Sequence, residues 1–299
     1  MKEGIGIMEK LRPIEIKFRG HEPHWVGNGF WVSQYFPRGM NLLERFTPFI
    51  LMDYNAPFEF PPSDNPRGIG PHPHRGFETV TFAFEGAVEH HDNAGNHGII
   101  YPGDVQWMTA GKGILHKEYH EKEFSKSGGI FHMIQLWVNL PREDKMTEPR
   151  YQDLAKEDMG EYILEDNKGR VAIVAGEFKG VKGPAKTFSP INIYTIELEN
   201  GGSIDFAEPG DYNTGILVLS GDIKINNRES SEKDFILFHN REGDIRIESI
   251  SEKAKVIVLS GQPIDEPIAT GGPFVMNTKE EIATASKDFR EGKFGSSDF

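Results

Sequence analysis

Residues 70–84 read GPHPHRGFETVTFAF, and this stretch indicates the fold more clearly than any other. In its second half apolar and polar residues alternate, which is typical of a β-strand with one buried face. Pro71 and Pro73 exclude a helix in the first half and weaken pairing in a sheet, so a sheet edge or strand entrance is expected there. His72 and His74 are two residues apart, so an extended chain presents both imidazoles on the same side.

Similar alternating segments recur along the chain, separated by Gly, Pro, Asn and Asp. They include FHMIQLWVNL at 131–140, VAIVAGEF at 171–178, INIYTIELE at 191–199 and AKVIVLSG at 254–261. Short strands at this spacing predict an antiparallel β-sandwich or barrel and argue against βαβ units.

The 299 residues are enough for two domains of ordinary size. A charged connector separates two strand-rich halves, and residues 84–108 and 219–238 share a strand–turn–strand outline that suggests a duplication. The predicted organisation is a first barrel at 1–145, a connector at 146–165, a second barrel at 166–270, and a helix and tail at 271–299.

Two segments have helical character. One is Arg150–Leu154, within the charged connector. The other begins at Thr278, which forms a predicted capping box with Glu281. Ile282, Ala285 and Phe289 then recur at helical spacing, so this stripe is expected to pack on a barrel surface.

Composition excludes several function classes. The chain carries 33 basic and 46 acidic residues, a net charge of −13, which disfavours direct binding to nucleic acid or to anionic membranes. It contains no cysteine, which excludes disulfides, thiolate metal sites and cysteine nucleophiles and is compatible with a reducing compartment. No secretory signal and no apolar run long enough to cross a bilayer is visible, so we expect a cytoplasmic protein.

Histidines are concentrated in the first half, which holds ten of the eleven. A second pair with spacing two, His116 and Glu118, follows a Gly-rich turn. If it lies beside His72 and His74 on a neighbouring strand, three imidazoles and one carboxylate meet in one cavity. That set suits a divalent first-row metal and leaves coordination positions open.

Other histidines are alternatives to this set. His120 shares the His116 face of a strand and is the nearest rival ligand, and His132 could also face inward. His90, His91 and His97 lie among Asp, Asn and Gly, a composition typical of a turn, so we interpret them as solvated loop residues.

The motifs PHPHRGFETVTF, GDVQWMTAGKGILHKE, IQLWVNLP and GPFVMNTKEEI strongly resemble the pirin family of the cupin superfamily. The resemblance is dense from about Thr47 to Leu140 and returns at 272–295. It implies a bicupin, an all-β fold of two antiparallel jelly-roll (cupin) barrels packed together, with a short C-terminal helix and a metal only in the first barrel.

The same resemblance assigns the metal ligands as His72, His74, His116 and Glu118, the four that spacing alone brings together. Glu78, a ligand in other cupins, is then not one. The resemblance implies one divalent ion per chain, with iron expected and zinc, nickel, manganese or copper as other occupants.

The activity that the resemblance implies is that of a quercetin 2,3-dioxygenase, with a flavonol-like aromatic substrate and dioxygen. Glu118 is the expected catalytic base because it alone among the ligands could accept the substrate proton. The alternative is a non-enzymatic, metal-dependent and redox-sensitive regulator that binds a transcription factor or a metabolic enzyme.

Three further residues are candidates for the surroundings of the metal. Arg75 could hold an anionic substrate or orient Glu118, although a structural salt bridge is the simpler interpretation. Asp53 is expected at the cavity mouth. Gln135 shares a strand face with Met133 and Trp137, and spacing does not decide whether this face lines the pocket or the core between the barrels; for Trp137 core packing is the default.

Overall fold

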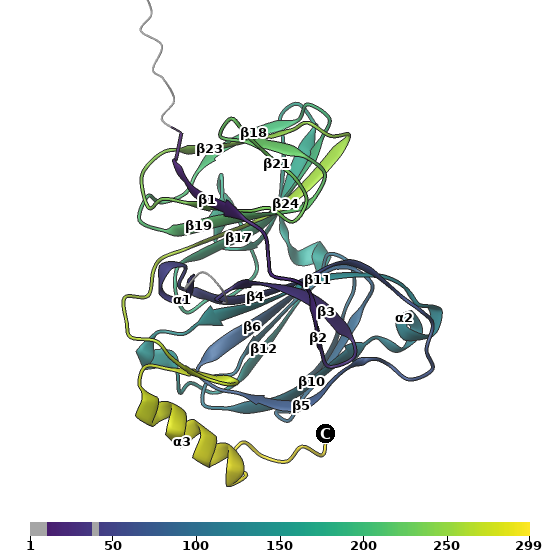
Figure 1. Ribbon diagram of the computed structural model, residues 1–299, viewed down its shortest axis with the longest axis vertical. Coiled ribbons are helices and arrows are strands. Elements are labelled where there is room, and N and C mark those ends of the chain that lie inside the picture. The colour runs from purple at the N-terminus through teal and green to yellow at the C-terminus, as the bar shows by residue number, and fades with distance from the viewer. Residues whose placement is uncertain (1–10, 38–41) are drawn as a thin grey trace, which may run out of the picture.

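The computed structural model describes residues 11–37 and 42–299, and strands dominate it. Every ladder between the named strands of this part of the chain is antiparallel, and the strands form two barrels (Figure 1). The prediction of an all-β fold with two antiparallel jelly-roll barrels and a short C-terminal helix is confirmed.

The first barrel combines a seven-stranded and a four-stranded sheet. The larger sheet has the order β12 (Arg150–Leu154), β9 (Val105–Thr109), β6 (Phe77–Glu85), β11 (Gly129–Asn139), β4 (Phe49–Phe60), β3 (Phe30–Phe36) and β2 (His24–Val26). The smaller sheet has the order β5 (Gly68–His74), β10 (Ile114–His120), β7 (Val88–Asp92) and β8 (His97–Ile100).

The second barrel repeats this combination. Its larger sheet has the order β1 (Ile14–Phe18), β22 (Phe235–Phe238), β19 (Asn213–Ser220), β24 (Lys253–Gly261), β17 (Ile191–Glu199), β14 (Gly169–Ala175) and β13 (Gly160–Ile163). Its smaller sheet has the order β18 (Ser203–Ala207), β23 (Asp244–Ser249), β20 (Ile223–Ile225) and β21 (Arg228–Ser230). The recurrence agrees with the duplication expected from the sequence.

The remaining elements are short. They are β15 (Glu177–Phe178) and β16 (Val181–Lys182), β25 (Ala269–Gly271) and β26 (Phe274–Met276), the helices α1 (Leu42–Arg45), α2 (Lys122–Ser127) and α3 (Lys279–Arg290), and the 3₁₀ turns η1 (Arg142–Asp144) and η2 (Lys156–Asp158). Among the described residues, no helix is long and apolar enough to cross a membrane.

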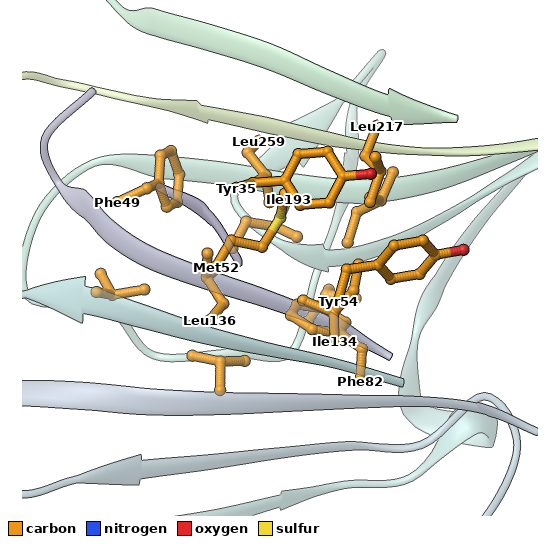
Figure 2. Packing of buried hydrophobic residues seen from close by; sticks show 14 of the residues in the cluster. Tyr35, Phe49, Met52, Tyr54, Phe82, Ile134, Leu136, Ile193, Leu217 and Leu259 are labelled. Atoms are coloured by element: carbon orange, nitrogen blue, oxygen red, sulfur yellow. The ribbon is translucent and has the colours of Figure 1, made fainter. Parts of the chain in front are cut away.

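The two large sheets pack face to face and form one apolar core. Its residues come from both halves of the sequence, for example Met52, Tyr54 and Leu136 from the first and Leu217 and Leu259 from the second (Figure 2). Along these strands, residues buried in the shared core alternate with residues that face the interior of their own barrel. Each large sheet therefore contributes to two cores.

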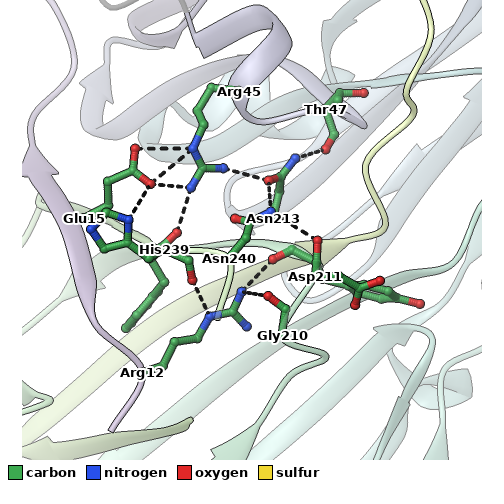
Figure 3. A network of polar contacts seen from close by, with 11 residues as sticks. Arg12, Glu15, Arg45, Thr47, Gly210, Asp211, Asn213, His239 and Asn240 are labelled. Carbon is green, nitrogen blue, oxygen red and sulfur yellow. Dashed lines mark hydrogen bonds and ion pairs between the residues drawn. The ribbon is translucent and has the colours of Figure 1, made fainter. Parts of the chain in front are cut away.

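Both chain ends cross from one barrel to the other. β1 pairs with β22 of the second barrel, so the predicted range of the first barrel, residues 1–145, is wrong for this strand (Figure 1). Figure 3 shows how this segment is held: the Arg45 guanidinium binds the Glu15 carboxylate and donates to the Asn213 side chain at 2.7 Å. The buried Arg12 donates to backbone carbonyls of the second barrel, including that of His239 at 2.9 Å.

The C-terminal segment returns to the first barrel. Thr278 and Glu281 form the predicted capping box of α3. Ala285 is fully buried and Ile282 packs beside it against Leu115 and Phe274, which confirms the predicted packing for these two residues. Phe289 is 40% exposed and contacts the rings of Phe274 and Phe294, so the stripe is only partly covered.

The connector is more regular than expected. Arg150–Leu154, predicted to have helical character, is strand β12 and pairs with β9 at the edge of the first barrel. β13 within the same connector pairs with β14 of the second barrel. Asp153 and Glu161 are exposed on these strands, whereas Arg150 is half-buried, near Glu78 and over the Phe188 ring.

Candidate metal centre

Three histidines meet where β5 and β10 pair. His72 lies directly opposite His116 across this ladder, and His74 is two residues further along β5. Their ring centroids are 4.2 Å apart for His72–His116 and 4.9 Å apart for both His72–His74 and His74–His116. One ligand nitrogen from each ring lies within 4.8 Å of the other two, so the three could bind one ion.

Glu118 follows His116 on the same face of β10 and is buried. Its carboxylate lies within 4.8 Å of ligand nitrogens of His116 and His90, whereas the group around His72 and His74 shares only His116 with it. The four residues predicted as ligands are thus gathered around His116. The Thr81 hydroxyl lies 3.3 Å from Oε1 of Glu118 and 2.7 Å from Oε1 of Gln135, and its single proton can be donated to only one of them.

The donor set fits a divalent metal ion. Nδ1 of His72 lies 2.9 Å from the Gly70 carbonyl and Nδ1 of His74 lies 3.3 Å from the Pro273 carbonyl. A carbonyl can only accept, so Nδ1 carries the proton and the Nε2 lone pair is free to bind a metal. Nε2 of His116 is buried without any hydrogen-bond partner. Burial also lowers the pKa of His74 and of His116 well below the usual value, which keeps both rings neutral as metal ligands must be.

His90 is placed differently from the prediction. It lies on β7, fully buried, and its Nδ1 is 3.4 Å from Nδ1 of His116. Its Nε2 is 3.3 Å from Oδ2 of Asp92, which is also buried. The interpretation of His90 as a solvated loop residue was therefore wrong, because Val88, His90 and Asp92 alternate along a strand and face inward. That alternation was the available signal. His91 and His97 are not loop residues either, although their side chains are partly exposed.

The two rival histidines lie outside the cluster. Nε2 of His120 is 2.7 Å from the Gly29 carbonyl, its ring packs among phenylalanines, and burial lowers its pKa to about 4. His132 pairs with the Tyr54 hydroxyl at 2.9 Å, and burial lowers its pKa to about 3.

A cavity of about 230 Å³ opens beside the cluster. Its walls combine ligand residues, apolar side chains from the opposite sheet and a piece of the C-terminal segment; they are Val26, Phe30, Val32, Asp53, Ile69, His72, His74, Glu118, Met133, Gln135, Trp137, Gly272 and Pro273. The face of β11 with Gln135 therefore lines the cavity. Trp137 does so as well, with its ring 5.3 Å from that of His74, and its other contacts are the core packing that was expected, against Ile50, Phe77 and Val275.

Asp53 and Gln135 lie in a polar row that crosses the sheet. Gln34, Asp53, Gln135 and Thr81 face one another in register on four successive strands. The Gln34 amide donates to Asp53 at 3.3 Å, and the hydroxyl of Thr81 is 2.7 Å from the Gln135 amide. Burial in the cavity wall raises the pKa of Asp53 to about 6. The row ends at Thr81, which contacts the Glu118 carboxylate.

Arg75 does not belong to the cavity, which corrects the idea that it binds substrate or orients Glu118. Its guanidinium binds Asp288 of α3 at 2.9 Å, donates to the Lys112 carbonyl at 2.6 Å and lies 4.5 Å from the centroid of the Phe294 ring. This is the structural salt bridge that the sequence left as the simpler alternative.

Glu78 lies apart from the ligand groups. The Thr109 hydroxyl donates to it at 2.7 Å and Arg150 is 3.8 Å away, while burial raises the pKa of Glu78 to about 7. In the second barrel, the described residues contain no group of three potential ligand side chains. The candidate centre is therefore the His72, His74, His116 and Glu118 set.

Comparisons with known proteins find matches to both halves of the chain. The family model described as Pirin matches residues 29–138, and the model described as Pirin C-terminal cupin domain matches residues 193–295. A Pseudomonas aeruginosa protein named "Putative quercetin 2,3-dioxygenase" is 44% identical over 271 residues, which is 91% of this chain and 94% of the relative.

Human pirin is 38% identical over 262 residues, covering 85% of this chain and 84% of its own. Among solved structures, the quercetin 2,3-dioxygenase from Acinetobacter baumannii superposes with a TM-score of 0.91 at 42% identity and covers 96% of this chain and 99% of its own.

Proposed function

Because the chain belongs to the pirin family, we propose that it is a metal-dependent dioxygenase of the quercetin 2,3-dioxygenase type, which opens a flavonol ring with dioxygen. The observation that carries the proposal is the cluster of three imidazoles and one carboxylate beside an apolar cavity. Relatives at 42% and 44% identity are named for this activity.

The proposed ligands of one divalent ion, iron in the cell, are His72, His74, His116 and Glu118. A bound ion would supply a Lewis-acidic centre with coordination positions open to a substrate hydroxyl and to dioxygen. Zinc, nickel, manganese or copper could replace iron after expression, because affinity for these ligands does not follow biological use.

The residues of the chain have separate roles in this proposal. Glu118 accepts the proton of the substrate hydroxyl, and the Thr81 hydroxyl lies 3.3 Å from its carboxylate. Phe30, Met133 and Trp137 hold the aromatic ring and exclude water from it.

The size of the cavity bears on the substrate. At about 230 Å³ it lies below the roughly 300–1,000 Å³ typical of pockets that enclose a drug-sized ligand. A three-ring flavonol would extend past the cavity mouth, so an assay should include one-ring and two-ring phenols with a hydroxyl beside a carbonyl.

Oxygen uptake by iron-loaded protein with flavonols tests the proposal, with bound metal measured in parallel. Glu118→Gln should keep much of the metal, because its amide oxygen still ligates weakly, but lose about 10²–10⁴-fold in turnover for want of a base. His74→Ala should lose metal and activity together. A fully active Glu118→Gln would reject the base assignment.

An iron-loaded wild type that consumes no oxygen with any of these phenols would reject the enzyme. The protein would then be a metal-binding regulator with a protein partner, the second hypothesis from the sequence. In either case we place its action in the cytoplasm, which the absence of cysteine favours.

A further inference from the structure

The β7–β8 hairpin carries a second cluster of ligand side chains on the face opposite the buried centre. Residues 88, 90 and 92 of β7 face the interior, so Glu89 and His91 face outward. His97 of β8 lies directly opposite His91 across the ladder. Two rigid, paired strands thus present two imidazoles and one carboxylate on one outer surface.

Hydrogen bonds join the three side chains, and their ligand atoms are close enough to bind one ion. Oε1 of Glu89 is 3.0 Å from Nε2 of His91 and 3.0 Å from Nε2 of His97. The two rings have centroids 4.3 Å apart, and one ligand atom from each of the three residues lies within 4.8 Å of the others. Ligand atoms bound at about 2.0–2.2 Å to a tetrahedral ion lie roughly 3.3 Å from one another, so little movement is needed.

The surroundings are accessible and lack competing contacts from the interior. The side chains of Glu89, His91 and His97 are 25%, 34% and 51% exposed. Lys117 faces His91 from β10. Its ammonium group, however, binds the Phe299 carbonyl and lies over that ring, 5.0 Å from the centroid.

We propose that Glu89, His91 and His97 bind a second divalent transition-metal ion, of the zinc, nickel or copper class, at the surface. Two imidazoles and one carboxylate are the ligand types these ions select, and a fourth position remains for water or an external ligand. The inference does not depend on the reaction proposed above. The ion binds more weakly than one in the buried centre, because its ligands are solvated and number three.

The site has a structural consequence for the buried centre. An ion bridging β7 and β8 fixes the hairpin whose inner face holds His90 against His116. An ion bound to Glu89, His91 and His97 therefore stabilises β7, the strand that places His90 beside the proposed ligand.

Zinc titration of metal-free protein against a chromophoric chelator tests the proposal. Wild type should bind two ions per chain. The double variant His91→Ala/His97→Ala should bind one, in the buried centre, and His74→Ala should keep the outer ion. The control is His239→Ala, which removes an exposed histidine 3.6 Å from a single carboxylate, that of Glu15, and should leave two ions.

Zinc-soaked crystals should show an anomalous peak between the three outer side chains. If the double variant does not fold, the single variant His97→Gln should still weaken the outer ion at least 10-fold. Zinc binding that is the same in number and affinity in the wild type and in both outer-site variants would overturn the site.

Discussion

At the scale of single residues, the proposed ligand His116 is backed by a chain of buried polar groups. Nδ1 of His90 lies 3.4 Å from Nδ1 of His116 and 3.0 Å from the Gln106 amide nitrogen. Its Nε2 faces the Asp92 carboxylate. Such a chain fixes the orientation and proton position of a metal-binding imidazole, and partners of this kind typically contribute about 10- to 100-fold in metal affinity.

The first prediction concerns this chain. Asp92→Asn keeps the oxygen that accepts from the Ala94 and Asn96 amides but removes the negative charge beside His90. Metal affinity should fall about 10-fold, measured by competition with a chelator, while the unfolding midpoint changes little. Asn96→Ala, which removes another neighbour of the same carboxylate, should leave the affinity nearly unchanged. Equal affinities for wild type and Asp92→Asn would show that the chain does not act on the metal.

A second residue-scale prediction uses Glu78, whose pKa burial raises to about 7. In the unfolded chain this carboxyl loses its proton near pH 4.5, whereas the folded protein holds it until about pH 7. The native state binds more protons in that window, so ionisation of Glu78 costs stability as the pH rises through it.

Glu78→Gln should therefore gain stability relative to wild type as the pH rises from about 4.5 to 7. The gain should level off above pH 7 at a value on the order of 3 kcal/mol. Urea unfolding at several pH values measures it. A difference between the two proteins that does not vary with pH would contradict the raised pKa.

At this scale the sequence predicted correctly which side chains share a face, where their spacing along an extended chain alone determines it. The spacing of two in His72/His74 and in His116/Glu118 brings the side chains to one face of an extended chain whatever the fold. It failed for His90, because Asp, Asn and Gly beside a strand look like a turn when the pairing partner is unknown. The partner of Arg75 could not be predicted either, since Asp288 is more than two hundred residues away.

At the scale of elements, the C-terminal segment completes the first barrel. Val275 donates its backbone N–H to the Arg75 carbonyl, and the Pro273 carbonyl accepts from His74. We call this segment, residues 269–299, the strap. Lys145 binds it to the first barrel, because its buried ammonium donates to the carbonyls of Gly76 at 2.8 Å and Val275 at 3.1 Å. The strap is thus both a wall of the cavity and a partner of a proposed ligand.

Lys145→Met should loosen this strap. The substitution keeps the length of the side chain but leaves buried carbonyls without a donor, so we expect a loss of about 2–4 kcal/mol and faster proteolysis after residue 271. Lys293→Met is the matched control on the same strap, because that lysine is 56% exposed. A strap equally resistant in both variants would show that Lys145 does not hold it.

Local signals predicted the ends of elements better than their partners. Thr278 and Glu281 correctly predicted the start of α3, because all groups of a capping box lie within four consecutive residues. The prediction of helical character for residues 150–154 is wrong because a charged, polar sequence suits both an exposed helix and an exposed edge strand. Only the ladder with β9 decides between the two.

At the scale of the whole molecule, the two barrels are joined by more than the connector. β1 completes the large sheet of the second barrel, while the strap from residue 269 onward completes the first. The apolar core between the large sheets contains residues of both halves. The duplicated outline was visible in the sequence, but this exchange of ends was not, because it depends on contacts about two hundred residues apart.

This arrangement predicts that the barrels unfold together. The four tryptophans, Trp25, Trp31, Trp107 and Trp137, all lie on strands of the first barrel, so their fluorescence reports on that barrel and, through Trp107, on the core between the large sheets. Phe206 is 6% exposed and lies in the core of the second barrel, in a cluster that contains no tryptophan. Phe206→Ala removes a buried aromatic ring and should cost about 3–5 kcal/mol.

If the exchanged ends and the shared core couple the barrels, Phe206→Ala must shift the tryptophan transition as far as it shifts the circular dichroism transition, because one cooperative step then governs both signals. Independent barrels would instead leave the tryptophan midpoint in place and split the circular dichroism curve into two steps. Chemical denaturation followed by both signals in one sample distinguishes these outcomes. Because the strap that contacts His74 reaches the first barrel from the second, coupled unfolding would also mean that a core substitution in the metal-free barrel lowers the stability of the proposed metal centre.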